Sequence, residues 1–260
     1  MNGKRISVLA GACAMALIGT LAAPAGAQTA EIKEKPPLYT YEAFWTMPRA
    51  KWAEMEKSDA TTQKVMDKAL ASGALVGYGS DATVIHSDDG TTHDSWWQSL
   101  SMAGVLNVLD DLSGASSAPN SVLASATKHH DELAVSRYYN WKAGSWKGAY
   151  THAAIYSLKP DAPNDAIELL AKSVIGPMME KLLADGTIIE WEIDVQAVHS
   201  EAPGTFSVLY VAPKAEGLDK VSAALRERSK ASALLGPAMD SLVDISKHRD
   251  ALVRSTVTYK

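Results

Sequence analysis

The sequence predicts an α+β protein with two copies of one β-α-β-β-α-β unit, the ferredoxin-like order of elements. Two observations predict this fold. Residues 66–90 and 179–203 align without a gap at a constant offset of 113, and eight aligned positions are identical. Each copy also alternates strand-like and helix-like hydrophobic periods in the same order. We therefore expect ferredoxin-like repeats at residues 38–140 and 149–260, joined by a linker at residues 141–148.

The duplication includes polar and glycine positions as well as apolar ones. Two copies of about 110 residues indicate a duplication and not a solenoid, whose units are shorter and more numerous. The identical pairs of the gapless segment are Met66/Met179, Lys68/Lys181, Leu70/Leu183, Ala71/Ala184, Gly73/Gly186, Asp81/Asp194, His86/His199 and Ser87/Ser200.

The elements of each copy follow from local patterns. An aromatic-rich first strand is expected at residues 39–47, and an amphipathic helix at residues 50–71 with Gly73 as its C-terminal cap. The second strand is clearest at residues 189–197, where apolar and acidic residues alternate strictly. Third strands are expected at residues 94–100 and 205–212, and last strands at residues 133–139 and 252–259, after helical segments.

The N-terminus predicts export. Lys4 and Arg5 precede an apolar run at residues 6–21, and small residues lead up to Ala27. This pattern is typical of a secretory signal peptide at residues 1–27, followed by an extension at residues 28–37. A membrane anchor is the alternative, but nothing basic follows the run. We expect a periplasmic or secreted protein without membrane insertion after cleavage.

Composition excludes several classes of function. Without Lys4 and Arg5, 23 of the 25 basic residues remain against 30 acidic ones, a net charge of −7. An acidic chain without a basic cluster argues against nucleic-acid partners. The only cysteine, Cys13, lies in the signal peptide, so no thiolate site is expected. No metal-ligand, nucleophile or phosphate-loop signature is present, and no metal or cofactor is predicted.

The segments Lys-His-His-Asp-Glu-Leu at residues 128–133 and Lys-His-Arg-Asp-Ala-Leu at residues 247–252 enter each last strand. With the tandem ferredoxin-like order, they give a chain that resembles the dimeric α+β barrel superfamily, which includes antibiotic-biosynthesis-type monooxygenases and chlorite dismutases. The resemblance implies an intrachain pseudo-dimeric barrel covered by helices, with small molecules bound inside or between sheet and helices. Some members bind heme through a histidine; no histidine here matches that motif, so heme stays open but unsupported.

Aromatic residues and histidines share one face of the first and third strands. In a closed barrel, we expect such a face to line a cavity; ordinary core packing is the alternative. His93 and His152 are the candidate proton acceptors, because the other copy has Phe206 and Tyr41 at their positions. The candidate ligand-binding residues are Tyr41, Trp45, Trp97, Tyr156 and Tyr210.

Carboxylates share one face of the second strand in the second copy. Glu190 and Glu192 stand where the first copy has Gly77 and Gly79. If this face lines the barrel, it makes an asymmetric pocket in which Glu190 and Glu192 are further catalytic candidates; if it meets solvent, it is a charged sheet edge. The duplicated histidines, His86/His199 and His129/His248, are assigned a structural role, such as hydrogen bonds that fix a turn.

Together these features predict an exported small-molecule-binding protein, or a cofactor-independent enzyme of monooxygenase or lyase type. The partner would be a small hydrophobic or aromatic compound in the barrel cavity. A heme enzyme of the chlorite-dismutase type and a non-catalytic structural or interaction module are the alternatives. Homo-oligomerisation is left open.

Overall fold

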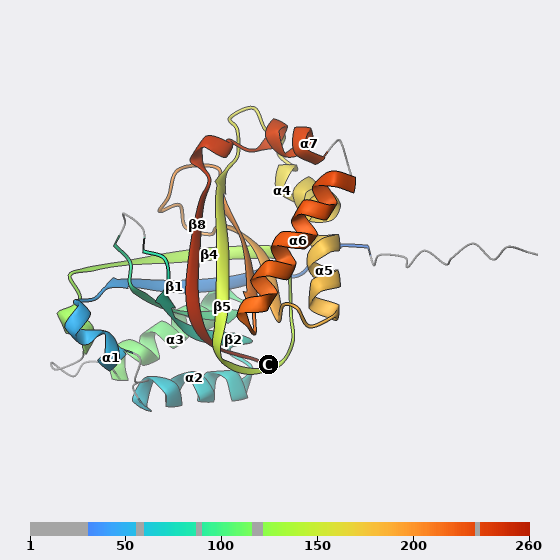
Figure 1. Ribbon diagram of the computed structural model, residues 1–260. Coiled ribbons are helices and arrows are strands. Elements are labelled where there is room, and N and C mark those ends of the chain that lie inside the picture. The colour runs from blue at the N-terminus through green and yellow to red at the C-terminus, as the bar shows by residue number, and fades with distance from the viewer. Residues whose placement is uncertain (1–30, 56–59, 87–89, 116–121, 232–234) are drawn as a thin grey trace, which may run out of the picture. The chain divides into compact units, whose positions relative to one another are not determined.

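Eight antiparallel strands close into a barrel in the order β1-β3-β2-β8-β5-β7-β6-β4 (Figure 1). The computed structural model describes residues 31–55, 60–86, 90–115, 122–231 and 235–260, so the expected signal peptide lies outside the described residues. The strands are β1 (Leu38–Thr46), β2 (Gly77–Thr83), β3 (His93–Ser99), β4 (Lys128–Trp141), β5 (Gly144–Ser157), β6 (Glu190–Gln196), β7 (Thr205–Ala212) and β8 (Arg249–Tyr259).

The strand order confirms two ferredoxin-like sheets within one chain. The first repeat contributes β4-β1-β3-β2 and the second contributes β8-β5-β7-β6, which is the same order shifted by four strands. Antiparallel pairs between β2 and β8 and between β4 and β6 join the two sheets into the closed barrel. The fold class predicted from the duplication is therefore correct.

Helices cover the outer face of each sheet. In Figure 1, α2 and α3 lie below the sheet of the first repeat, and α5 and α6 lie to the right of the sheet of the second. No helix among the described residues is long and apolar enough to span a bilayer. The helices are α1 (Trp52–Met55), α2 (Ala60–Ser72), α3 (Met102–Ala115), α4 (Ala166–Leu169), a π-helical segment (Leu170–Ile175), α5 (Gly176–Ala184), α6 (Ala215–Ala231) and α7 (Leu235–Leu242), with short 3-10 turns at Arg49–Lys51, Val122–Ser125 and Ile245–Lys247.

The junction between the repeats and the ends of two helices can now be compared with the expected boundaries. The junction between the repeats is shorter than the expected linker, because β4 continues to Trp141 and β5 begins at Gly144. Gly73 and Gly186 follow the equivalent helices α2 and α5, and both have φ of 80°. Glycine adopts this left-handed conformation without a Cβ penalty, which explains why the pair is identical in the two copies.

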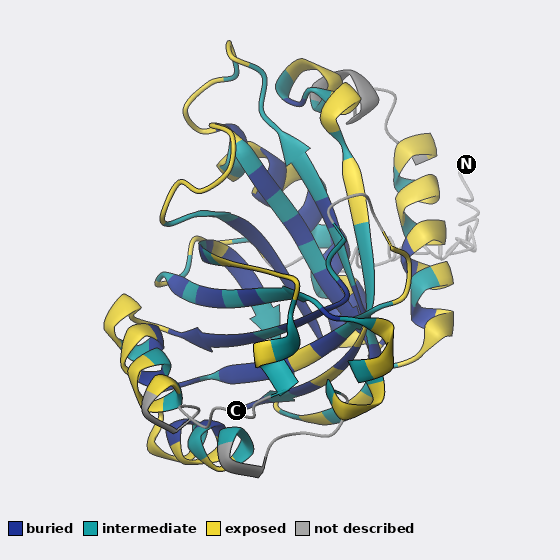
Figure 2. Cartoon of the chain, turned by 90° about the vertical axis from the view of Figure 1, so that its left-hand side faces the viewer, coloured by how far each residue is buried: buried dark blue, intermediate teal, exposed yellow. Residues whose placement is uncertain are grey.

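The core has three parts. One cluster lies between α2, α3 and the first sheet, and a second lies between the helices of the second repeat and its sheet. A third cluster, which includes Trp96, Val211, Val257 and Tyr259, fills one end of the barrel interior. Figure 2 shows the resulting pattern, with buried residues along the strands and exposed residues on the outer sides of the helices.

Candidate functional site

The predicted aromatic residues of the first repeat lie beneath its helices. Tyr41 stacks on Trp97 with ring centroids 4.5 Å apart, and Trp45 packs against the same cluster. The indole Nε1 of Trp97 donates to the backbone oxygen of Val105 in α3 at 2.9 Å. These side chains therefore lie on the outer face of the sheet, whereas we expected them to line the barrel cavity.

The second repeat repeats this placement. His152 stacks on Tyr210 with ring centroids 5.1 Å apart, and Tyr156 stacks on Phe206 at 5.4 Å. Tyr210 and Phe206 belong to the cluster beneath the helices of this repeat. The expectation of a barrel lining is corrected here too, because alternate residues of a strand point to opposite faces and this set points outward. Their roles in binding stay predictions.

The structure does not bring the two candidate histidines together. His93 is on β3 of the first repeat, buried, with Nδ1 3.0 Å from the hydroxyl of Thr92 and its ring edge-on to Trp52 at 5.9 Å. His152 is on β5 of the second repeat. Each lies on a different sheet under different helices, so they cannot act as a pair.

A shared carboxylate joins two histidines on the outer face of the second repeat. Oδ1 of Asp250 lies 3.3 Å from Nε2 of His152 and 3.2 Å from Nε2 of His248. The ring of His248 stacks on Tyr156 with centroids 4.5 Å apart. Sequence reasoning gave His248, beside Asp250 in the duplicated segment at residues 247–252, a structural role and did not connect either residue to His152.

The surroundings of His152 favour its neutral form. Burial lowers the pKa of His152, while the Asp250 carboxylate acts in the opposite direction. Nε2 of His152 lies 3.3 Å from Oδ1 of Asp250, and Nδ1 is buried without a hydrogen-bond partner among the described residues. About a quarter of the side chain is exposed, at 27%. A neutral imidazole can accept a proton, and the nearby Asp250 carboxylate would stabilise the protonated form.

The first repeat has an equivalent carboxylate and histidine, but the third residue beside them is different. Nε2 of His129 lies 3.1 Å from Oδ1 of Asp131. Tyr41 takes the place of His152, and its hydroxyl donates a hydrogen bond to Asp131. Burial and this carboxylate raise the pKa of Tyr41, so the phenol stays protonated. The first repeat therefore lacks a neutral base at this place.

A groove with a mixed lining lies at one end of the same outer face. Its volume is about 160 Å³, and its lining combines apolar residues with polar ones: Leu158, Ile167, Val195, Gln196, His199, Ala202, Gly204, Thr205 and Phe206. A cavity of about 150 Å³ lined by apolar side chains is large enough to bind benzene. The stack of Phe206 on Tyr156, and of Tyr156 on His248, connects this groove to the shared carboxylate.

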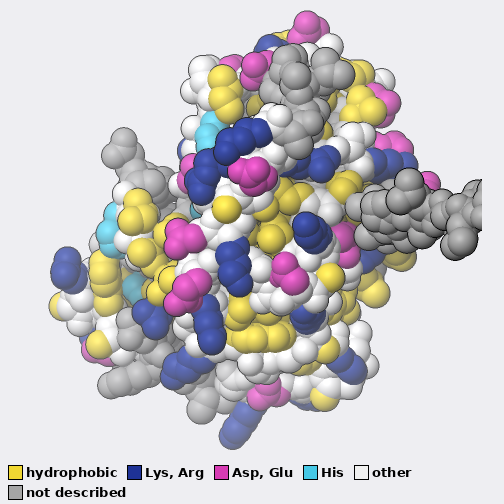
Figure 3. Space-filling view, turned by 45° about the vertical axis from the view of Figure 1, so that its right-hand side comes forward, with side chains coloured by type: hydrophobic (Ala, Val, Ile, Leu, Met, Phe, Trp, Pro, Cys, Tyr) yellow, Lys and Arg dark blue, Asp and Glu magenta, His cyan; other side chains and the backbone are white. Residues whose placement is uncertain are grey.

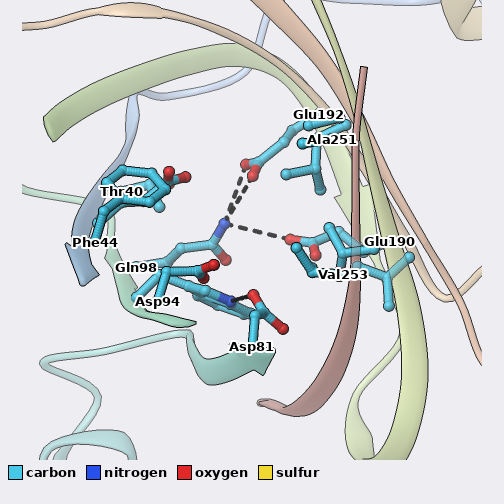
Figure 4. Close-up of a pocket in the computed structure, with 15 residues that line it drawn as sticks. Thr40, Phe44, Asp81, Asp94, Gln98, Glu190, Glu192, Ala251 and Val253 are labelled. Carbon is cyan, nitrogen blue, oxygen red and sulfur yellow. Dashed lines mark hydrogen bonds between the residues drawn. The ribbon is translucent and has the colours of Figure 1, made fainter. Parts of the chain in front are cut away.

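Glu190 and Glu192 face the barrel interior, so the solvent-edge alternative is wrong. They line a cavity of about 80 Å³ with Asp81 and Asp94 from the opposite wall, and Gln98 reaches between the walls (Figure 4). Nε2 of Gln98 donates to Glu192 at 3.0 Å and to Glu190 at 3.3 Å. Sequence reasoning anticipated the β2 part of the opposite wall but missed Glu42, Asp94 and Gln98, because it assigned the aromatic set of β1 and β3 to the interior.

The carboxyls of the interior are shielded from water. Burial raises the pKa of Glu190 to about 8 and that of Asp194 to about 7. Burial also raises the pKa of Glu192, Asp94 and Glu42 well above their usual range. None of the residues that line this cavity is basic among those described. The interior therefore holds many acceptors and no internal countercharge.

Aromatic rings occupy the space that side chains at positions 77 and 79 would need. A Cβ at Gly77 would lie 2.6 Å from the ring of Tyr259, and one at Gly79 would lie 2.5 Å from the ring of Trp96. The hydroxyl of Tyr259 donates to Glu190, and Nε1 of Trp96 donates to Asp81 at 3.0 Å. The small residues of β2 thus make room for two rings that hold carboxyls in place.

The geometry does not fit a metal or heme group in this cavity. No group of three or more histidine, cysteine or acidic side chains among the described residues is arranged to hold a metal ion. No histidine lines the cavity, and about 80 Å³ has room for only a few atoms. On the outer face, Nε2 of His152 and Nε2 of His248 lie 3.3 Å and 3.2 Å from the same carboxylate oxygen of Asp250, which leaves no room for an iron between the imidazoles and that carboxylate.

Solved structures with the same fold include two bacterial proteins proposed as monooxygenases. The one from Lactobacillus acidophilus NCFM superimposes with a TM-score of 0.61 at 13% identity, over 86% of this chain and 97% of that chain. The one from Fusobacterium nucleatum gives 0.62 at 8% identity, over 87% and 95%. The chain therefore shares the fold of these two proteins, an α+β barrel built from two ferredoxin-like sheets.

More distant comparisons give no further assignment. Chlorite dismutase from Candidatus Nitrospira defluvii superimposes with a TM-score of 0.47 at 11% identity, over 84% of this chain and 90% of that chain, which is too low to transfer a heme site. No protein-family model matches the sequence, and no curated protein is significantly similar to it.

Proposed function

We propose that the protein is a monooxygenase-like enzyme whose site lies on the outer face of the second repeat. The observation that carries this proposal is the His152–Asp250–His248 arrangement, in which burial lowers the pKa of His152 and its Nδ1 has no hydrogen-bond partner among the described residues. The proteins of the same fold that are proposed as monooxygenases support the reaction class. His152 would be the general base, and Asp250 would orient it and stabilise its protonated form.

The substrate class follows from the walls of this face. Tyr156, Tyr210 and Phe206 offer aromatic rings, and the adjoining groove has room for one further ring. A base requires an acidic proton on its substrate, which a phenol or hydroquinone supplies. Removal of that proton leaves an electron-rich anion, which dioxygen oxidises. One oxygen atom replaces a ring hydrogen and becomes a quinone carbonyl, and the other leaves as water with the displaced ring hydrogen and the hydroxyl proton. We therefore propose a small hydroxyaromatic substrate.

Export is part of the same proposal. The charged start, the apolar run and the small residues before Gln28 support cleavage after Ala27 and a place in the periplasm or outside the cell. On the face seen in Figure 3, basic and acidic side chains are interspersed, which supports a small-molecule partner over a nucleic acid. N-terminal sequencing of the exported protein tests the cleavage site directly.

Oxygen uptake tests the activity. The purified protein is mixed with a panel of phenols, naphthols and hydroquinones, and we expect uptake above the rate without protein for at least one compound. His152→Ala should lower the rate by about 100-fold or more, because general-base catalysis contributes on that scale. His129→Gln is the matched control in the first repeat and should leave the rate unchanged. Equal rates in His152→Ala and the wild type would contradict the assignment.

A further inference from the structure

The barrel interior is separate from the histidine site, and several of its acceptors have no donor. Oε1 of Gln98, Oγ1 of Thr40 and Oδ1 of Asp194 are buried without a hydrogen-bond partner among the described residues. Gln98 is 1% exposed and Thr40 is 2% exposed, and they face each other across β1 and β3. A buried hydrogen-bond acceptor without a partner costs free energy. A cavity wall with several such acceptors therefore favours a ligand that donates hydrogen bonds.

The charges around the cavity determine the sign of that ligand. Five of the lining side chains are carboxyls from both repeats, and none is lysine, arginine or histidine. Glu42, Asp81 and Asp94 come from three strands of the first repeat, and Glu190 and Glu192 come from β6 of the second. Burial keeps these carboxyls protonated, because the described lining offers no positive charge to stabilise their ionised form. A cation that enters supplies that charge and displaces their protons, whereas an anion would meet only acidic groups.

The size and donors of the ligand are also restricted. A cavity of about 80 Å³ is half the volume that accepts benzene, and it holds about five non-hydrogen atoms. Trp96, Val211 and Tyr259 close one end, whereas the half-buried Phe44 and Ala251 leave the other end open to entry. Because the described side chains have no metal-binding arrangement, an organic cation fits better than a divalent metal.

We propose that the barrel interior is a binding site for a small organic cation with several N–H donors, of the guanidinium or primary ammonium class. In this site, Glu42 and Asp94 on one wall and Glu190 and Glu192 on the other share the charge. A guanidinium group offers parallel N–H donors that match carboxylates. Gln98, whose amide already bridges Glu190 and Glu192, accepts through its free oxygen (Figure 4).

The test compares guanidinium with its neutral analogue. Thermal unfolding of the purified protein is followed with guanidinium chloride at low millimolar concentration, with urea at the same concentration, and with sodium chloride at the same ionic strength. We expect a rise in Tm of about 2 to 4 °C with guanidinium at tenfold above its Kd, and no rise with urea or sodium. No rise with guanidinium, or an equal rise with all three, overturns the proposal. A larger rise with calcium also overturns it.

Variants locate the site. Glu192→Gln keeps the volume and the contact to Gln98 but cannot ionise when a cation enters, and it should abolish the guanidinium response. Glu216→Gln removes an exposed acid on α6 and should keep the response. If Glu192→Gln does not fold, Glu42→Gln replaces it, with titration calorimetry of guanidinium into the wild type as the direct measurement. Unchanged binding in the barrel variant would place the cation elsewhere and overturn the proposal.

Discussion

The two repeats have the same carboxylate and histidine on their last strands, yet only the second repeat adds a base. In the first, Asp131 contacts His129 and the phenol of Tyr41. In the second, Asp250 contacts His248 and the imidazole of His152. A single difference between Tyr41 and His152 therefore separates a hydrogen-bonded phenol from a titratable group. Both repeats keep the carboxylate. The proposed base is present only in the second repeat, because the equivalent positions hold Tyr41 in the first repeat and His152 in the second.

The inner faces of the repeats differ in a similar way. On β6, Glu190 and Glu192 project into the barrel, while the equivalent Gly77 and Gly79 on β2 make room for aromatic rings. Without these glycines, Tyr259 and Trp96 could not lie where they hold Glu190 and Asp81. Divergence between the copies thus creates both candidate sites.

The largest expected effect is the loss of the orienting carboxylate. Asp250→Asn should lower turnover of the hydroxyaromatic substrate by about 100-fold, because His152 loses both its orientation and the charge that stabilises its protonated form. Asp131→Asn removes the equivalent group of the first repeat and should change turnover less than about twofold. Steady-state oxygen uptake measures both. Equal losses in the two variants would show that the repeats contribute alike.

A methyl group on the inner face of β2 should have the next largest effect. Gly79→Ala places a Cβ 2.5 Å from the ring of Trp96. The free energy of unfolding should fall by about 1–3 kcal/mol, as in other overpacked interiors. Glu192→Gln, at the equivalent position of β6, adds no volume and should change stability much less. Urea unfolding distinguishes them, and an unchanged midpoint for Gly79→Ala would mean that the interior is looser than described.

The interior carboxyls should make the protein less stable as pH rises. The pKa of Glu190 is raised to about 8 and that of Asp194 to about 7, so the folded state holds protons that the unfolded state releases from about pH 4 upward. The free energy of unfolding is then highest below pH 4. Above pH 4 it falls by about 1.4 kcal/mol per pH unit for each such group, until the pH reaches the pKa of that group in the folded state. His152, whose pKa is lowered, acts in the opposite direction near pH 6, but it is one group.

Urea unfolding at pH 5 and pH 8 measures this slope. Glu190→Gln should flatten the profile, because it removes one of the groups that titrate, whereas Glu216→Gln on the exposed helix α6 should leave it unchanged. Higher stability at pH 8 than at pH 5 in the wild type would show that the carboxyls are ionised in the folded barrel.

The smallest effect is expected at the duplicated histidines. His248→Gln should lower turnover a few-fold, because His248 stacks on Tyr156 and shares Asp250 with His152. His129→Gln should leave turnover unchanged and shift stability by less than about 0.5 kcal/mol, as is usual for exposed sites. Oxygen uptake and urea unfolding compare the pair. A loss in His129→Gln as large as in His248→Gln would remove the distinction between the repeats.

The architecture could be predicted from the sequence because the internal repeat and the alternation of apolar and polar residues are both regular patterns. The gapless pairing of residues 66–90 with 179–203 and the alternation at residues 189–197 predicted the order of the strands and most of their bounds, although β4 starts five residues before the expected residue 133. The linker was predicted too long, since Trp141 and Gly144 continue strands that pair with partners far away in the chain. Strand ends of this kind depend on tertiary pairing, which local sequence does not contain.

The sites were harder to predict because alternation does not say which face is inside. Aromatic residues such as Tyr41 and Trp97 were assigned to the barrel cavity, but they pack beneath helices, where large apolar side chains have more partners. The neighbours of opposite parity, Glu42 and Trp96, line the interior instead. Only the acidic alternation at Glu190 and Glu192 pointed to the correct face. The partnership of Asp250 with His152 joins two strands and required the structure.

Histidine side-chain NMR tests the central claim most directly. Imidazole resonances are recorded against pH, and then with 1,4-dihydroxynaphthalene as an anaerobic probe. We predict that His152 titrates below its ordinary value of 6.5, that Asp250→Asn lowers this midpoint further, and that the probe shifts His152 and His248 but not His129. A midpoint above 6.5 for His152, or probe shifts confined to the first repeat, would contradict the assignment of the site to the second repeat.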